Sequence, residues 1–171
     1  MAKVKIVTDS TCYMPKAYLE QYGIEVVPLY VRFGDEVLME NAMNFDDFYK
    51  RVRSSTVLPE TTQPSPEDFE KVYRKLLDEG YDIISIHISA GMSGTLNSAN
   101  AAKEALKSDK IHIFDSKFTS MGIGFQILEI ARMLYEENYP LDKVLEEIPS
   151  LAKHMNIYFL VDDLFWLARL G

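Results

Sequence analysis

The stretch IISIHISAGMSGT, residues 83–95, decides the fold prediction, because it reads as a buried strand, a short loop and the start of a helix. Residues 83–88 are nearly all apolar, which is typical of a parallel strand covered by helices on both faces. We expect a helix from Ser93 to about Lys107 after the loop. A strand that leads directly into a helix favours the α/β class.

The remainder of the chain continues this alternation. Apolar runs predict further strands at residues 4–7, 26–33, 111–114 and 157–161, with a hairpin return at 36–39. Spacing and capping residues predict helices at about residues 15–22, 45–53, 66–79, 119–137, 141–153 and 164–170. Residues 58–64 are expected to be irregular, because Pro59 and Pro64 bracket them. The predicted fold class is α/β, with a mainly parallel sheet flanked by helices.

Composition excludes several classes of function. The 171 residues carry 18 Lys and Arg against 26 Asp and Glu, a net charge of −8, and no basic run that would bind nucleic acid. No apolar stretch reaches the ~18 residues of a transmembrane segment, and the start of the chain turns polar at Thr8, before a signal peptide could form. A single cysteine, Cys12, cannot form an internal disulfide. We therefore expect a cytoplasmic protein with no structural metal site of the cysteine-rich kind.

The loop between residues 89 and 95 is the strongest candidate for a binding site. In open α/β sheets, ligands bind beyond the carboxyl ends of the strands. A helix that begins there offers unpaired backbone N–H groups and the positive end of its dipole. Ser93 and Thr95 add hydroxyl donors, and Gly91 and Gly94 let an anion approach the backbone. The loop suits a phosphate or a carboxylate, although a plain helix cap has the same composition.

Three further polar stretches, residues 8–11, 61–65 and 115–116, follow strands or could reach the same sheet edge. Each alone is typical of a turn, so their convergence would strengthen the case for a site. The helix expected after Met121 is apolar around most of its circumference and contains Gly122 and Gly124. It is suited to core packing, or to contact with an apolar ligand.

Known catalytic motifs are not matched. Residues 91–95 resemble the nucleophile elbow G-x-S-x-G, but Thr95 replaces the last glycine, and a triad would need Asp115 and His154. The dinucleotide and P-loop fingerprints do not occur. His87 and His112 lie within predicted strands and are expected to be packed and hydrogen-bonded. Cys12 has no evident histidine neighbour and is not expected to be a nucleophile.

Several of these stretches together resemble the DegV family from end to end. The residues that carry the resemblance are VTDST (7–11), VVPL (26–29), ETTQPSP (60–66), ISAGMSGT (88–95), DSK (115–117), MGIG (121–124) and VDDL (161–164). The resemblance implies a bacterial, cytoplasmic protein that binds a long-chain fatty acid such as palmitate in a tunnel between two domains. Some members present the fatty acid to a separate kinase, and the binding protein itself performs no chemistry.

Carried over residue by residue, the resemblance assigns the fatty-acid carboxylate to Thr61 and Ser93. Thr62, Gln63, Gly94 and Thr95 are the expected supporting residues, and no cofactor or metal is implied. The family usually has serine where this chain has Thr62 and Ala90.

The family also typically continues beyond the equivalent of Gly171. We therefore expect residues 1–160 to form the N-terminal α/β domain and residues 161–171 to begin the connection to a C-terminal domain. Two other interpretations remain open. An enzyme could act on a small phosphorylated or acyl substrate at the Ser93 helix N-terminus. Alternatively, the apolar residues 164–170 could dock a partner protein.

Overall fold

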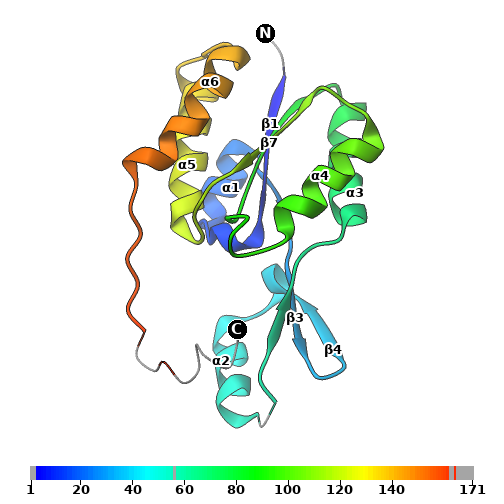
Figure 1. Cartoon of the computed structure of the whole chain (residues 1–171), viewed down its shortest axis with the longest axis vertical. Helices are drawn as coiled ribbons and strands as arrows, with labels where there is room; N and C mark the ends of the chain where they lie inside the picture. The colour runs from blue at the N-terminus through cyan, green and yellow to red at the C-terminus, as the bar shows by residue number, and fades with distance from the viewer. Residues whose placement is uncertain (1–2, 56, 162–163, 165–171) are drawn as a thin grey trace.

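The computed structural model describes residues 3–55, 57–161 and 164, and its main element is a four-stranded parallel sheet (Figure 1). The strands lie in the order β2-β1-β6-β7, with every neighbouring pair parallel. Their bounds are β1 Val4–Asp9, β2 Glu25–Val27, β6 Asp82–His87 and β7 Ile111–Asp115. This arrangement confirms the predicted α/β class with a parallel sheet.

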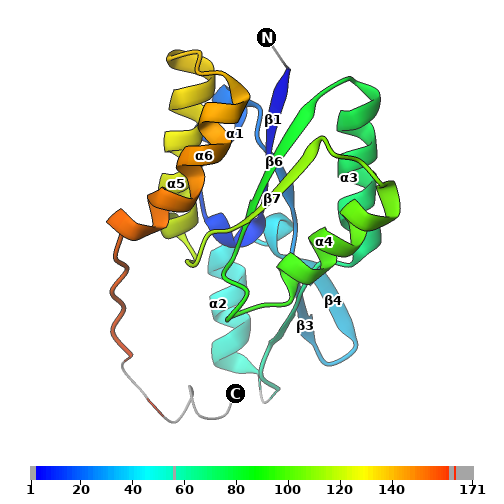
Figure 2. The same cartoon turned by 45° about the horizontal axis from the view of Figure 1, so that its top comes forward.

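Helices cover both faces of this sheet, as the tilted view in Figure 2 shows. One face carries α1 (Lys16–Tyr22), α5 (Met121–Ala131) and α6 (Leu141–Leu151), and the other carries α3 (Pro66–Asp78) and α4 (Thr95–Leu106). Each layer has its own apolar cluster, the first around Ile84 and Ile127 and the second around Phe69 and Tyr73. The helix predicted for residues 119–137 continues after α5 as a π-helical turn, Arg132–Glu136.

Local signals set the helix starts as expected. Ser65 and Asp68 form a reciprocal capping box at the start of α3, with Pro66 in the first helical position. The Asn44 side chain accepts hydrogen bonds from the backbone N–H groups of Asp46 and Asp47 at the start of α2 (Phe45–Ser54). These helix starts follow from a few neighbouring residues and could be predicted from the sequence.

A second, antiparallel sheet lies beyond the carboxyl ends of the parallel strands (Figure 1). Its order is β4-β3-β5, with bounds β3 Tyr30–Phe33, β4 Glu36–Met39 and β5 Glu60–Thr62. The predicted hairpin turn is confirmed, with Gly34 at φ +61. Two predictions are wrong here. The single strand expected over residues 26–33 is divided at Pro28, which has no N–H to donate, and residues 58–64 contain β5. Pro59 and Pro64 lie on either side of β5 rather than within it, and β5 pairs with the edge of β3 that β4 leaves free.

The strand predicted at residues 157–161 is also wrong, because these residues are extended without pairing to any described strand. Tyr158 and Leu160 are 90% and 91% exposed, respectively. An apolar run becomes a strand only where a sheet edge accepts it. The helix predicted at 164–170, and the segment 161–171 as a connection, lie outside the described residues apart from Val161 and Leu164.

Candidate functional site at the carboxyl edge of the sheet

Three of the predicted polar loops meet at one edge of the parallel sheet. Ile88 N donates to Asp9 Oδ2 at 2.9 Å, which joins the end of β1 to the end of β6. Ser116 N donates to the His87 carbonyl oxygen at 3.1 Å, and Ser89 N donates to that of Phe118 at 2.9 Å, which joins β6 to the loop after β7. The expected convergence of residues 8–11, 89–95 and 115–116 is therefore confirmed, since the carboxyl ends of parallel strands lie at one edge.

The loop after β6 ends at the N-terminus of α4. Gly94 is the N-cap residue and supplies no side-chain cap, so the positive end of the helix dipole is bordered by hydroxyl groups. Ser93 Oγ lies 2.9 Å from Thr95 Oγ1 and accepts a hydrogen bond from Thr95 N at 3.3 Å. Thr95 is buried and Ser93 half-buried. The two hydroxyl groups thus form a linked pair at an anion-compatible helix end.

The segment that ends β5 reaches the same helix end. A Cβ placed on Gly94 would lie 2.1 Å from Gln63 Oε1 and 2.7 Å from Gln63 Cδ, so the two residues are in direct contact. Glycine at position 94 is what permits this approach. Thr61 and Thr62 lie on β5, opposite Val31 and Tyr30, with exposed side chains.

The six site residues predicted from the sequence therefore lie on two segments that touch. Gln63 and Gly94 make the contact between the segments, Ser93 and Thr95 are hydrogen-bonded within one, and Thr61 and Thr62 directly precede Gln63 in the other. What the arrangement offers chemically is a set of neutral donors around a helix N-terminus, with no charged side chain among the six.

Sequence reasoning missed the extent of a buried polar network beside this loop. Asp9 Oδ1 accepts hydrogen bonds from Thr11 N at 3.0 Å and Thr11 Oγ1 at 2.5 Å, while Oδ2 lies 3.1 Å from His87 Nδ1. Burial by itself would raise the pKa of the Asp9 carboxyl. The interactions with His87, Thr11 and Ile88 N outweigh burial and hold this pKa below its ordinary value of 3.8.

The network continues from His87 into the core. Ser85 Oγ lies 2.6 Å from His87 Nε2 and 2.7 Å from the Tyr73 hydroxyl oxygen. Asp9, His87 and Ser85 thus follow the order of a catalytic triad, but all three side chains are fully buried and no substrate can approach Ser85. The prediction that His87 is packed and hydrogen-bonded is confirmed. The sequence signal for this network was the two-residue alternation of side chains along β6, which puts Ser85 and His87 on the same face of the strand.

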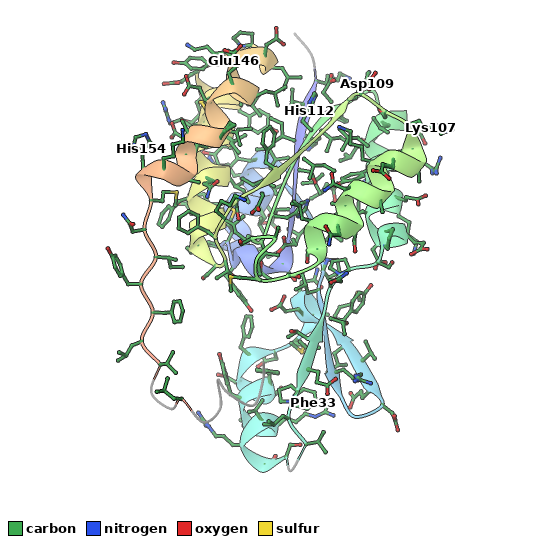
Figure 3. The ribbon with its side chains drawn as sticks, viewed as in Figure 1. Phe33, Lys107, Asp109, His112, Glu146 and His154 are labelled. Carbon is green, nitrogen blue, oxygen red and sulfur yellow. The ribbon has the colours of Figure 1, made fainter. Side chains whose placement is uncertain are left out.

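The other triad considered from the sequence is not assembled. Asp115 accepts hydrogen bonds from Lys117 N at 2.8 Å and Lys117 Nζ at 2.7 Å. His154 ends the 3₁₀ turn Ala152–His154 that follows α6, and α6 lies on the opposite face of the sheet from α4, the helix that begins after the Ser93 loop (Figure 3). Ser93 therefore lacks the histidine that the nucleophile-elbow interpretation needed.

A cavity of about 470 Å³ lies where β1 leads into α1. Its lining is mainly apolar and includes Cys12, Met14, Leu19 and Phe45. Burial raises the pKa of the Cys12 thiol to about 11, so at neutral pH this cysteine is a protonated, apolar side chain. Burial, together with a hydrogen bond to Glu40, also raises the pKa of Tyr13. The lining also includes the charged side chains of Lys16 and Glu40, so the cavity combines a mainly apolar wall with two charged groups.

Among residues 3–55, 57–161 and 164, no helix is long and apolar enough to cross a membrane. The same residues contain no group of three or more histidine, cysteine or carboxylate side chains placed to hold a metal ion.

Comparison with known proteins decides the family. The family model described as "Uncharacterised protein, DegV family" matches residues 3–171. The chain belongs to the DegV family. A DegV domain-containing protein of Clostridium perfringens is 38% identical over 172 residues, which cover 100% of this chain and 61% of the relative. A second DegV domain-containing protein, from Listeria innocua, is 37% identical, with 99% of this chain and 60% of the relative covered.

Solved DegV structures share the fold. The structure described as DegV, a fatty acid binding protein from Bacillus subtilis, is 35% identical, with a TM-score of 0.90, and the match covers 100% of this chain and 61% of that one. A DegV family protein from Thermus thermophilus, described by its fatty acid binding, is 34% identical, with a TM-score of 0.81 over 88% of this chain and 54% of that one. The chain spans about 60% of the length of the curated DegV relatives it matches.

Proposed function

We propose that this DegV family protein binds a long-chain fatty acid such as palmitate and holds its carboxylate between Thr61 and Ser93. Thr62, Gln63, Gly94 and Thr95 support this headgroup site. The observation that carries the proposal is the contact of Gln63 with Gly94, which brings two hydroxyl-bearing segments to one helix N-terminus. Solved relatives at 34–35% identity are described as binding fatty acids.

The chemistry of the two segments suits a carboxylate. An acidic chain with a net charge of −8 cannot attract an anion by its overall field, so local donors and the α4 dipole must orient the headgroup. Affinity would come mainly from the tail, because burial of each CH₂ contributes about 0.8 kcal/mol. We propose that the tail lies in an apolar tunnel.

The domain organisation is part of the proposal. Residues 1–160 would form the N-terminal domain of a two-domain protein, and residues 161–171 would lead into a C-terminal domain that completes the tunnel. The greater length of the matched relatives supports this organisation. We also propose a cytoplasmic location and presentation of the bound fatty acid to a kinase.

We propose that binding is not followed by chemistry on this protein. Both ring nitrogens of His87 are engaged inside the core, and the Cys12 thiol is buried with a raised pKa. Ser93 is hydrogen-bonded to Thr95 rather than to a general base. This arrangement favours binding over an enzyme that uses Ser93 as a nucleophile.

The test uses protein expressed from the complete gene. Denaturation followed by mass spectrometry is expected to release a long-chain fatty acid from the wild-type protein. The variants Thr61→Ala and Ser93→Ala are expected to retain less, because each removes a headgroup donor. Ser98→Ala, which removes a buried hydroxyl one turn further along α4, is the matched control and should retain the wild-type amount. Absence of any fatty acid, or substrate turnover that Ser93→Ala abolishes, would overturn the proposal.

A further inference from the structure

Asp9 and Ser10 are consecutive residues at the junction of the two sheets. Asp9 is the last residue of β1, and Ser10 begins the short 3₁₀ turn Ser10–Cys12. Both side chains are buried, and each hydrogen-bonds to a different part of the molecule. This pair lies outside the six headgroup residues described above.

The Asp9 side chain holds the end of β6. Its Oδ2 atom accepts a hydrogen bond from Ile88 N at 2.9 Å and lies 3.1 Å from His87 Nδ1. Ile88 is followed directly by Ser89, whose carbonyl oxygen accepts hydrogen bonds from Met92 N and Ser93 N. The position of Ser93 therefore depends on a strand end that Asp9 restrains.

The Ser10 side chain holds the antiparallel sheet. Its hydroxyl oxygen accepts a hydrogen bond from Leu29 N at 2.9 Å and donates to Glu40 Oε2 at 2.5 Å. Leu29 directly precedes β3 and Glu40 directly follows β4, and Glu40 N donates to the Leu29 carbonyl oxygen at 2.9 Å. Ser10 thus restrains the base of the β3–β4 hairpin.

That hairpin carries the other half of the headgroup site. β5 pairs with β3 on the edge opposite β4, with Thr61 opposite Val31. A displacement of β3 would therefore carry Thr61 and Gln63 with it. Hydrogen bonds at the end of β6 therefore connect Ser93 to Asp9. The hydrogen bond from Leu29 N and the pairing of β3 with β5 connect Thr61 to Ser10.

We propose that Asp9 and Ser10 are positioning residues that together set the spacing between the Thr61 segment and the Ser93 loop. Asp9 sets the position of the Ser93 loop, and Ser10 sets the position of the Thr61 segment. This assignment rests on the proposed function, because its effect on binding requires a carboxylate held between Thr61 and Ser93. Neither Asp9 nor Ser10 needs to touch that carboxylate.

The binding experiment compares two probes, palmitate and hexadecanol, which share a tail and differ in the charged headgroup. In protein from the complete gene, Asp9→Asn and Ser10→Ala are expected to weaken palmitate binding at least tenfold and hexadecanol binding less than twofold. Tyr135→Phe, which removes a hydroxyl that donates to the Val4 carbonyl oxygen at the other end of β1, is the control. Equal weakening of both probes, or no weakening, would overturn the proposal.

A second measurement needs no ligand. Backbone amide spectra of the ligand-free protein should show Asp9→Asn shifting signals mainly in residues 89–95 and Ser10→Ala shifting them mainly in residues 60–63. If wild-type protein binds neither probe, the proposed function fails while these shifts still decide the positioning roles. Absent shifts, or shifts spread evenly over the chain, would overturn the positioning roles of Asp9 and Ser10. Should Asp9→Asn fail to fold, Ser10→Ala alone carries both measurements.

Discussion

The two sheets differ sharply in how they are supported. In β6, five of six residues are buried between helical layers, whereas all three residues of β5 and most of β4 are exposed. None of the side chains of α2, which lies beside the antiparallel sheet in Figure 1, is buried. The Ser93 loop thus rests on the well-packed part of the molecule and the Thr61 segment on a thinly packed one. Regions with few buried apolar contacts open at lower free-energy cost.

The largest effect is expected in the packed region. Phe69 is fully buried, with its ring centroid 5.0 Å from that of His87 and 5.7 Å from that of Tyr73. Phe69→Ala should lower the free energy of unfolding by about 3–5 kcal/mol, measured by guanidinium titration, because it leaves a large cavity. The control is Phe45→Ala, since Phe45 at the start of α2 is 51% exposed. If Phe69→Ala lowers the free energy of unfolding no more than Phe45→Ala does, the two regions do not differ in how well they are packed.

A smaller effect is expected at the junction. Glu40 accepts hydrogen bonds from the hydroxyl groups of Ser10 and Tyr13, at 2.5 Å each. Glu40→Ala leaves both donors unpaired and should lower the free energy of unfolding by about 1–3 kcal/mol. Amide hydrogen exchange should accelerate more in β3 and β5 than in β6. Glu104→Ala, at an exposed position on α4, is the control. Equal acceleration in both sheets would contradict the separate support of the antiparallel sheet.

We expect the loss of stability at acidic pH to come from Asp9, on the well-packed side of the junction between the two sheets. The pKa of Asp9 is lower in the folded protein than its unfolded value of about 3.8. The stabilisation by the Asp9 carboxylate is therefore fully present above that value and is lost as the pH falls through the lower, folded pKa. Urea unfolding at a series of pH values below 5 should show a shallower decline for Asp9→Asn than for wild type. Asp109→Asn, in the exposed turn before β7, should retain the wild-type slope. A wild-type slope in Asp9→Asn would refute this assignment.

The smallest effect is expected for an ion pair on the antiparallel sheet. Arg32 of β3 contacts Glu60 of β5, with side chains 47% and 62% exposed. Such a pair contributes about 0–1 kcal/mol, because water screens it and both side chains lose freedom. Arg32→Ala should therefore change the free energy of unfolding by less than about 1 kcal/mol in urea titration. A loss above about 2 kcal/mol would show that side-chain pairing, rather than the junction, holds β5.

Prediction from sequence succeeded where the cause was local. The apolar run of β6 and the helix start at Ser65 and Pro66 each arise from neighbouring residues, and both are present as expected. The strand β5 was missed because its only local signals, Pro59 and Pro64, argue against a strand, while its partner β3 lies about 30 residues away. The strand expected at residues 157–161 failed for the converse reason, because an apolar run there has no described sheet edge beside it.

For the candidate site, the sequence by itself determined the chemistry. It supplied hydroxyl donors at Thr61 and Ser93, a glycine at position 94 and a helix start after the strongest strand, and these motifs were sufficient to indicate the DegV family. Only the tertiary structure decided that Gln63 touches Gly94 and that Asp9 reaches Ile88, 79 positions along the chain. Capping and periodicity act over a few residues. Contacts across such separations depend instead on strand order and register, which are settled only when the whole sheet assembles.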